Sequence, residues 1–120
     1  MGEIMPKRKI RATIENREEK VITETTAIYR DNIIKYKEED NTTVVYNYKK
    51  HKLVRENKEL RIEYIFSDAK EMTGLLFIKE LNKTININIK TRKIEEDKIN
   101  ISIEFEIDKD KFKYKIEAIK

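Results

Sequence analysis

Few side chains in this sequence have the types and spacing that catalysis requires. The chain has no cysteine and a single histidine, so a cysteine nucleophile is excluded and a serine–histidine pair would have to use His51. His51 stands in the lysine-rich segment YKKHKLV, with no carboxylate close to it in the sequence. This setting is typical of a solvated hairpin turn and not of a catalyst or a metal ligand. We therefore expect that the protein is not an enzyme.

The sequence also lacks the motifs that bind nucleotides and calcium. Two glycines are too few for the phosphate-binding loops GxGxxG and GxxxxGK[ST]. The acidic runs at residues 38–41 (EEDN) and 95–97 (EED) do not match the twelve-residue calcium loop, and we interpret both as charged loop tips. We expect no cofactor and no metal. A carboxylate pair for glycoside hydrolysis stays open, because the 23 acidic residues offer many pairs.

Arg55 is the charged residue whose orientation matters most for function. It stands two positions after Leu53 in HKLVREN, so both side chains share one face if this segment is a β-strand. If Leu53 faces inward, Arg55 does too, and its charge needs a carboxylate or a ligand anion. If Val54 faces inward instead, Arg55 is an ordinary surface residue. The sequence leaves both orientations open.

The charge balance of the chain is weakly basic. The net charge is +4, from 27 basic and 23 acidic residues, and the pI of about 9.1 is a level at which nucleic-acid binding is considered. The basic candidates are residues 7–11 (KRKIR) and the lysines at alternate positions from 109 to 115. Phe112 and Tyr114 alternate with these lysines and so face the opposite way, whereas base stacking needs both on one face. The pattern favours core packing over nucleic-acid binding.

The elements that carry these side chains are expected to be β-strands. Residues 99–119 (INISIEFEIDKDKFKYKIEAI) alternate apolar and polar residues, which is typical of strands with one buried and one exposed face. The closing hairpin is predicted to pair Ile107 with Phe112. Outward glutamates then face outward lysines, Glu106 opposite Lys113 and Glu104 opposite Lys115, and such pairs explain the lysines structurally.

The same alternation recurs in shorter segments. The inward face of residues 21–29 (VITETTAIY) is not decided by its pattern. Residues 67–81 fit either a helix or a loop through Met72 followed by a strand, and Gly74 with the apolar run LLFI favours the strand. The residues expected to face the core are Ile10, Ala12, Ile14, Ile34, Tyr36, Val44, Tyr46, Tyr48, Leu60, Ile62, Tyr64, Phe66, Ile85, Ile87, Ile89, Ile99, Ile101, Ile103, Phe105, Ile107, Phe112, Tyr114, Ile116 and Ala118.

About nine or ten short strands with few helical segments predict an all-β barrel or sandwich. Charged residues make up 42% of the chain, but the periodic placement of strong strand formers argues against disorder. Asparagine and aspartate, which tolerate positive φ, are expected to form the turns in place of glycine. The length of 120 residues fits one domain. We expect residues 1–7 to be a disordered arm and residues 8–120 to be the folded domain.

The order of these features resembles the YwiB-like bacterial proteins, uncharacterised β-barrels of calycin-like architecture. The resemblance runs from Ile10 to Ile119, through VITETTAIY, IIKYKEE, TVVYNY, LVRENKELRIEYIF, GLLFIKELNKTININIKTRKI and the closing hairpin. Asn57 stands where the family pattern has a turn glycine. The resemblance implies a single closed or nearly closed antiparallel β-barrel of about 8–10 strands, calycin-like, whose relatives such as lipocalins hold small apolar ligands. It implies no catalytic residues.

Two functions follow as expectations. The first is binding of a small apolar or amphipathic ligand in the barrel interior, oriented by Arg55, Tyr36, Tyr46 and Tyr64. The alternative is a non-enzymatic protein- or nucleic-acid-interaction module that uses the basic outer face. The N-terminal residues lack the apolar stretch of a secretory signal, and we expect a cytoplasmic protein that does not bind membranes. It is expected to be a monomer or a homodimer.

Overall fold

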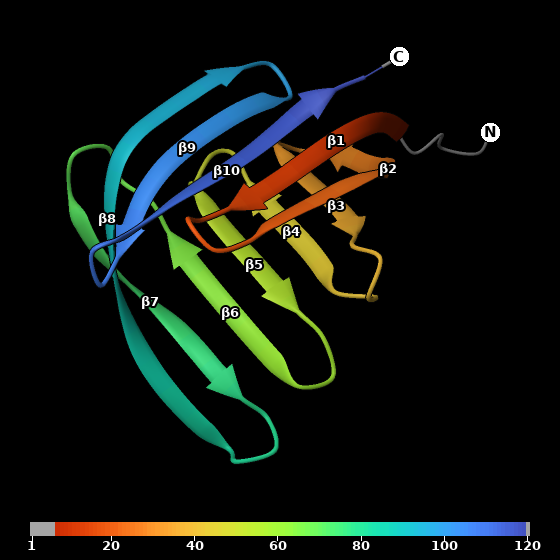
Figure 1. The fold of residues 1–120 in the computed structure, drawn as a ribbon. Helices are drawn as coiled ribbons and strands as arrows, with labels where there is room; N and C mark the ends of the chain where they lie inside the picture. Colours follow the sequence, from red (N-terminus) through yellow and green to blue (C-terminus); the bar gives the residue numbers. More distant parts are fainter. Residues whose placement is uncertain (1–6, 120) are drawn as a thin grey trace.

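The computed structural model describes residues 7–119, which form ten antiparallel strands closed into one barrel (Figure 1). Each strand pairs with the next along the chain, and β10 pairs with β1 to complete the barrel. The predicted all-β closed barrel is therefore confirmed. The strands are β1 (Lys7–Glu15), β2 (Lys20–Arg30), β3 (Ile33–Lys37), β4 (Thr43–Asn47), β5 (Lys52–Glu56), β6 (Leu60–Ile65), β7 (Glu71–Ile78), β8 (Lys83–Asp97), β9 (Asn100–Ile107) and β10 (Asp110–Ala118).

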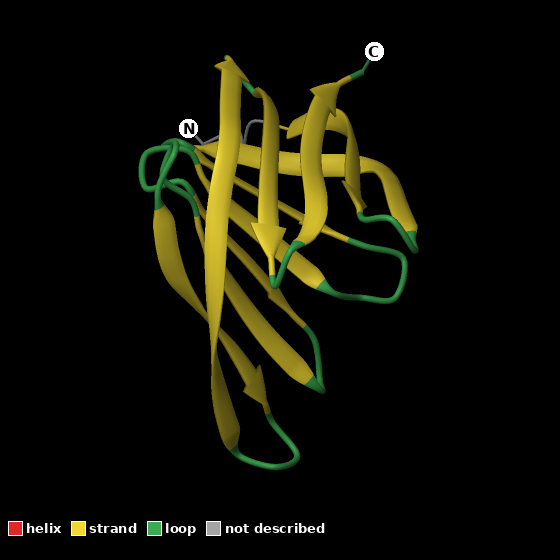
Figure 2. Ribbon diagram, turned by 60° about the vertical axis from the view of Figure 1, so that its left-hand side comes forward, coloured by secondary structure: helices red, strands yellow, loops and turns green. Residues whose placement is uncertain are grey.

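The strands are joined by turns and short loops (Figure 2). Within residues 7–119, no helix is long and apolar enough to cross a membrane. The first and last strands lie side by side, because β1 pairs with β10 from Ile10 opposite Ala118 to Glu15 opposite Lys113. The predicted disordered arm, residues 1–7, lies outside the described residues except for Lys7, where β1 begins.

The inward-facing side chains form one apolar core. In β2 the inward face is that of Thr23 and Ala27, which are buried. Two residues predicted to face the core, Ile85 and Ala118, are exposed, because they lie towards the ends of β8 and β10. The predicted alternation is confirmed at the centre of the barrel, where the buried residues include Ile10, Ala12, Ile34, Tyr36, Val44, Tyr46, Tyr48, Tyr64, Phe66, Ile89, Ile101, Ile103, Phe105, Tyr114 and Ile116.

The β9–β10 hairpin differs from the prediction in its register. Ile107 pairs with Asp110, and Phe112 pairs with Phe105, so the predicted pairing of Ile107 with Phe112 is wrong by two residues. The cause is the turn, because Asp108 and Lys109 have φ of 49° and 70° and form a two-residue hairpin turn with left-handed backbone at both positions. An even shift leaves the inward and outward faces unchanged.

The segment after Phe66 is a strand and not a helix, as the sequence favoured, since β7 begins at Glu71. Gly74 lies in β7 where this strand approaches β6 closely. A Cβ atom at Gly74 would press against the backbone carbonyl oxygen of Glu63 and lie 2.8 Å from the Cδ1 atom of Ile89. The glycine therefore permits the close approach of the two strands that shapes this side of the barrel.

The long strand β8 connects the two halves of the barrel. It pairs with β7 through residues 83–90 and with β9 through residues 89–97, and a β-bulge lies between Thr91 and Lys93 in the part that pairs with β9. The bulge inserts one extra residue, so the inward positions change from Ile89 and Thr91 to Ile94. A change of this kind bends the strand, and the strong curvature of β8 is visible in Figure 1.

Asparagine and aspartate occupy many of the tight turns, as predicted. Their left-handed backbone conformations replace those that glycine commonly supplies. The residues of these two types with positive φ are Asp31, Asn32, Asn41, Asn82 and Asp108.

Candidate functional site at the open end of the barrel

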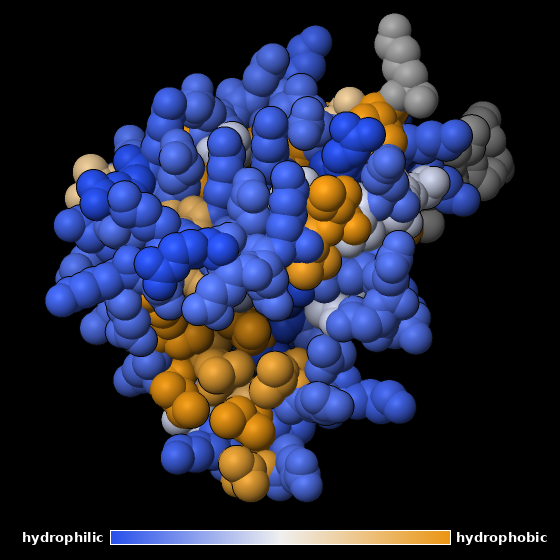
Figure 3. All heavy atoms as spheres, in the orientation of Figure 1, coloured by the Kyte–Doolittle hydropathy of each residue, from blue (hydrophilic) through white to orange (hydrophobic). Residues whose placement is uncertain are grey.

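At one end of the barrel, β6, β7 and β8 extend past the β1–β2 turn (Figures 1 and 2). Apolar side chains gather on the surface at this end, in the lower part of Figure 3. In β6 and the first part of β8, Ile62 and Ile87 are partly buried against the core, and Ile85 is 38% exposed. We call this end of the barrel the open end.

A pocket of about 230 Å³ lies at the open end, between the β1–β2 hairpin and strands β5, β6 and β10. We call it the open-end pocket. The side chain of Asn16 fixes the hairpin at its rim, because Asn16 Oδ1 accepts hydrogen bonds from the backbone N–H groups of Glu18 and Glu19 at 2.9 and 2.8 Å. The lining residues are Ile14, Val21, Ile62 and Phe112 on the apolar side, and Glu15, Asn16, Glu19, Arg55 and Tyr64 on the polar side.

Arg55 is directed into the barrel. It shares a face of β5 with Leu53, which is fully buried. Its Nη2 atom donates a hydrogen bond to Oε1 of Glu38 at 2.6 Å, and the Arg55 and Glu38 side chains are 20% and 7% exposed. Of the two orientations that the sequence left open, the inward one with a carboxylate partner is found. Arg55 is one of the residues that line the open-end pocket.

The loop between β3 and β4 positions Glu38. Its backbone N–H donates to the Thr42 carbonyl at 2.9 Å, and its own carbonyl accepts from the N–H of Asn41 at 3.0 Å. Asn41 has a φ of 68°, which turns the chain back towards β4. The side chain of Asn57, in the β5–β6 turn, donates to the Thr42 hydroxyl at 3.1 Å. Two neighbouring turns therefore hold the carboxylate against Arg55.

The guanidinium of Arg55 keeps hydrogen-bonding capacity beyond its bond to Glu38. Of its five N–H donors, the one on Nε is buried and has no acceptor within residues 7–119. Burial lowers the pKa of Arg55, but the hydrogen bond and charge of Glu38 outweigh it and raise the pKa overall. Burial raises the pKa of Tyr64, and the neighbouring Arg55 only partly offsets this. Arg55 is therefore charged and the Tyr64 hydroxyl neutral at physiological pH.

Tyr36 and Tyr46 do not line the open-end pocket. The Tyr36 and Tyr114 hydroxyls share a buried hydrogen bond of 2.8 Å across the barrel, and burial raises the pKa of both. The Tyr46 hydroxyl donates to Glu96 at 3.4 Å. Of the four residues that the sequence proposed for ligand binding, the structure thus brings Arg55 and Tyr64 together at the pocket and places the other two deeper in the barrel.

Aromatic rings fill the middle of the barrel. The rings of Phe66 and Phe105 have centroids 4.9 Å apart, and those of Tyr46 and Tyr114 are 6.1 Å apart. All four side chains are almost completely buried. A ligand that enters the barrel therefore meets packed rings beyond Arg55 and Tyr64, and the candidate site is the open end and not the centre.

His51 lies near the opposite end, in the turn between β4 and β5. Its Nε2 atom is 3.0 Å from Oε1 of Glu96, a residue far from it in the sequence, and its side chain is 36% exposed. The sequence could not show this contact, because β8 brings Glu96 across from a distant part of the chain. Among residues 7–119, no three His, Asp or Glu side chains lie together as a metal-binding group.

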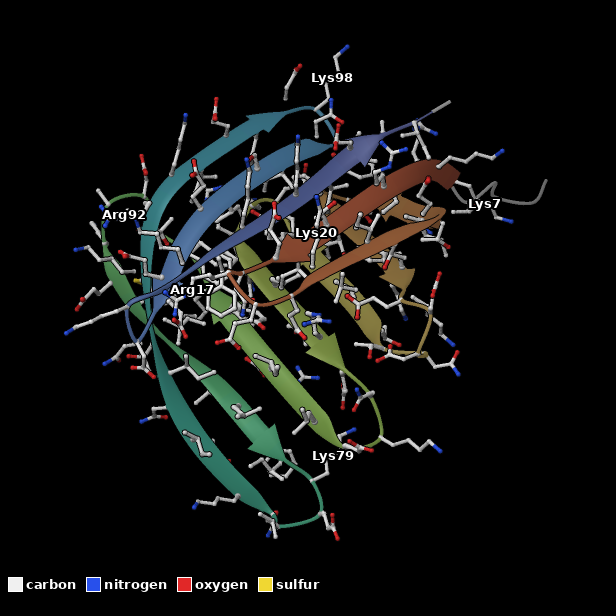
Figure 4. The ribbon with its side chains drawn as sticks, in the orientation of Figure 1. Lys7, Arg17, Lys20, Lys79, Arg92 and Lys98 are labelled. Atoms are coloured by element: carbon white, nitrogen blue, oxygen red, sulfur yellow. The ribbon has the colours of Figure 1, made fainter. Side chains whose placement is uncertain are left out.

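Positively and negatively charged side chains lie next to one another on the outer face of the barrel. Lys113 pairs in register with Glu104, and Lys111 with Glu106, while Arg92 forms an ion pair with Glu106 at 2.9 Å. Figure 4 shows labelled cations on different sides of the barrel, with Lys98 and Lys7 towards one end and Lys79 towards the other. The basic side chains are thus spread over the surface.

Sequence analysis missed Glu38 as a member of the site. The acidic run at residues 38–41 was interpreted as a charged loop tip, which is wrong for Glu38, since it is only 8% exposed. A signal was present, because Glu38 continues the inward alternation of Ile34 and Tyr36. Ile14, Ile62 and Phe112 were predicted to face inward, but the alternation could not indicate that they line an opening.

Comparison with known proteins gives a likeness of fold. No family model matches the chain, and a comparison with curated proteins finds no match. The crystal structure of the YwiB protein from Bacillus subtilis is similar, with a TM-score of 0.62 and 14% sequence identity, over 95% of this chain and 91% of that one. The resemblance inferred from the order of the strands is confirmed at the level of architecture. This chain therefore has the YwiB-like β-barrel fold.

Proposed function

We propose that the protein binds a small amphipathic ligand in the open-end pocket and acts by binding, without catalysing a reaction. The observation that carries this proposal is a pocket of about 230 Å³ whose lining joins apolar side chains to the largely buried side chain of Arg55. Ligand sites in proteins commonly combine a mostly apolar lining with a few placed polar groups. Arg55 and Tyr64 supply these polar groups here.

The apolar surface at the open end supports the same proposal. Ile85 and Val21 are 38% and 37% exposed, although both lie on the inward faces of their strands. Exposed apolar side chains next to a pocket are typical of ligand-binding openings. A ligand with its polar end at Arg55 would cover apolar side chains at the open end with its apolar body.

The proposal is tested with N-phenyl-1-naphthylamine, an uncharged apolar dye whose fluorescence rises on binding. We expect saturable binding to the wild-type protein. Val21→Glu places a charge in the pocket and should weaken dye binding about tenfold or more, since the dye loses an apolar contact and would have to remove water from the new carboxylate. Val21 is partly exposed, so this variant is expected to fold.

The matched control is Ile22→Glu, at the adjacent position on the outward face of β2, where the side chain is 49% exposed. It adds the same charge outside the pocket and should leave dye affinity within about twofold of wild type. Absence of saturable dye binding, or equal weakening by the two substitutions, would contradict the proposed site. Native mass spectrometry of freshly purified protein provides a second measurement, in which a bound ligand appears as added mass.

A further inference from the structure

We infer that the polar group recognised in the open-end pocket is an uncharged hydrogen-bond acceptor, such as an amide, ester or ketone oxygen, and not a carboxylate or an ammonium group. This inference rests on the proposed function and specifies the chemical class of the ligand. It follows from the charges and the donors around Arg55.

The positive charge of Arg55 is already neutralised within the protein. Glu38 lies 2.6 Å from Arg55 Nη2, and its carboxylate is 7% exposed, so water screens the pair poorly. A ligand carboxylate that reached the guanidinium would also approach Glu38 and leave one uncompensated negative charge in a poorly solvated place. The pair therefore offers no net charge that an anion could neutralise.

The same guanidinium still has donors to offer. Of its five N–H groups, one on Nη2 bonds to Glu38, and the Tyr64 hydroxyl also interacts with the guanidinium. The Nε atom is buried, so the donors that a ligand can reach are the remaining ones on the two Nη atoms. The Tyr64 hydroxyl lines the pocket beside Arg55 and stays neutral, because burial raises its pKa. The base of the pocket thus combines free donor capacity with zero net charge, which suits a carbonyl oxygen.

The charges at the rim and at the base of the pocket together act against both kinds of charged ligand. Glu15 and Glu19 line the entrance, and their carboxylates repel an entering anion. Lys20, whose Nζ atom lies 4.0 Å from Oε2 of Glu15, compensates one of the two. A cationic ligand would pass this rim favourably, but beside the neutral Arg55–Glu38 pair it would leave one uncompensated positive charge. An uncharged head group avoids both penalties.

The size of the pocket sets how much of the ligand it holds. At about 230 Å³ it is smaller than the roughly 300–1,000 Å³ of sites that enclose a drug-sized ligand. It accommodates the polar end and a short apolar segment, and the rest of the ligand would lie against the apolar side chains of the open end, among them Ile62 and Ile85.

The inference is tested with three probes that share one alkyl chain: decanamide, decanoate and decylammonium. Each competes with N-phenyl-1-naphthylamine for the wild-type protein at neutral pH. We expect decanamide to bind about tenfold or more tightly than either charged probe, since a charged head group stays uncompensated beside the neutral Arg55–Glu38 pair. This comparison needs no variant, so it does not depend on whether a substituted protein folds.

The variant Glu38→Gln tests the role of the carboxylate. It removes the negative charge beside Arg55 and keeps a side chain of similar shape, so the guanidinium charge becomes available. We expect decanoate to gain at least about tenfold in affinity relative to decanamide in this variant. Circular dichroism at the binding temperature establishes that the variant is folded.

The outcomes separate this inference from the proposed function. If the dye binds and decanoate or decylammonium competes as well as decanamide, the inference is overturned and the ligand site stands. If decanoate does not gain in a folded Glu38→Gln protein, the neutralising role of Glu38 is wrong. If neither the dye nor any of the three probes binds, the proposed function fails and the inference fails with it.

Discussion

The contact between Arg55 and Glu38 places two formal charges against the inner wall of the barrel. Removing two charges from water is costly, and a close ion pair recovers only part of that cost. The surrounding hydrogen bonds of Thr42 and Asn57 hold the loop that carries Glu38, so the pair is kept in one geometry. Such a pair contributes orientation more than stability.

The first prediction concerns the two partners taken singly and together. Glu38→Ala leaves the Arg55 charge unpaired and should lower the free energy of unfolding by about 3 kcal/mol. The double substitution Glu38→Leu with Arg55→Met removes both charges and should lie within about 1 kcal/mol of wild type, or above it. Urea unfolding followed by circular dichroism measures all three proteins. If Glu38→Ala lowers the free energy of unfolding by no more than the double variant does, the burial of the pair is contradicted.

At the level of the strands, tight turns decide the register of each hairpin. The alternation of Ile103, Phe105 and Tyr114 correctly predicted which side chains face inward, because the period of two is a property of any strand. It could not predict which residues pair, since a shift by two keeps the same faces. The pairing depends on whether residues 108–111 form a four-residue or a two-residue loop, and the chain has no glycine there to indicate the tighter turn.

The second prediction uses this turn. Lys109 has a φ of 70°, in the left-handed region that costs most residues other than glycine about 1 kcal/mol. Lys109→Gly should therefore raise the free energy of unfolding by roughly 0.5–1 kcal/mol. The control Lys111→Gly, two residues later within β10, should lower it, because glycine weakens a strand interior. Thermal unfolding compares the two, and stabilisation by both substitutions would argue against the turn as the cause.

For the whole molecule, the sequence predicted the architecture much better than the site. A barrel is specified by many repeated alternations, so an error in one register or at one bulge leaves the fold unchanged. The site depends on single contacts between distant segments. Glu38 meets Arg55 only because β3, β4 and β5 are consecutive in the barrel, and Glu96 meets His51 only because β8 reaches the far end of the molecule.

The third prediction concerns acid stability. Hydrogen bonds from Lys79 and Arg61 lower the pKa of Glu56, and those from Arg61 and Lys52 lower the pKa of Glu63, below their ordinary value of 4.5. A carboxylate with a lower pKa in the folded state stabilises the fold above its unfolded pKa and loses this contribution as the pH falls. The free energy of unfolding should therefore decrease as the pH is lowered below 4.5.

The variant Arg61→Met tests the cause, since Arg61 is a partner of both glutamates. It should reduce the acid dependence of the free energy of unfolding, and added salt should reduce it in the wild type, because exposed pairs are screened. Arg8→Met is the control, since the Arg8 side chain is exposed and bonds to the backbone carbonyl of Lys7. An unchanged acid dependence in Arg61→Met would show that other groups are responsible.

The pairing of β1 with β10 has a consequence for the newly made chain. During translation β1 emerges well before β10. The edge of β1 that pairs with β10 in the folded protein therefore has unpaired backbone N–H and C=O groups until the last strand is made. An exposed strand edge of this kind invites pairing with neighbouring polypeptides. The exposed cations Lys9 and Arg11 on β1 oppose such contacts between nascent chains until the ring is complete.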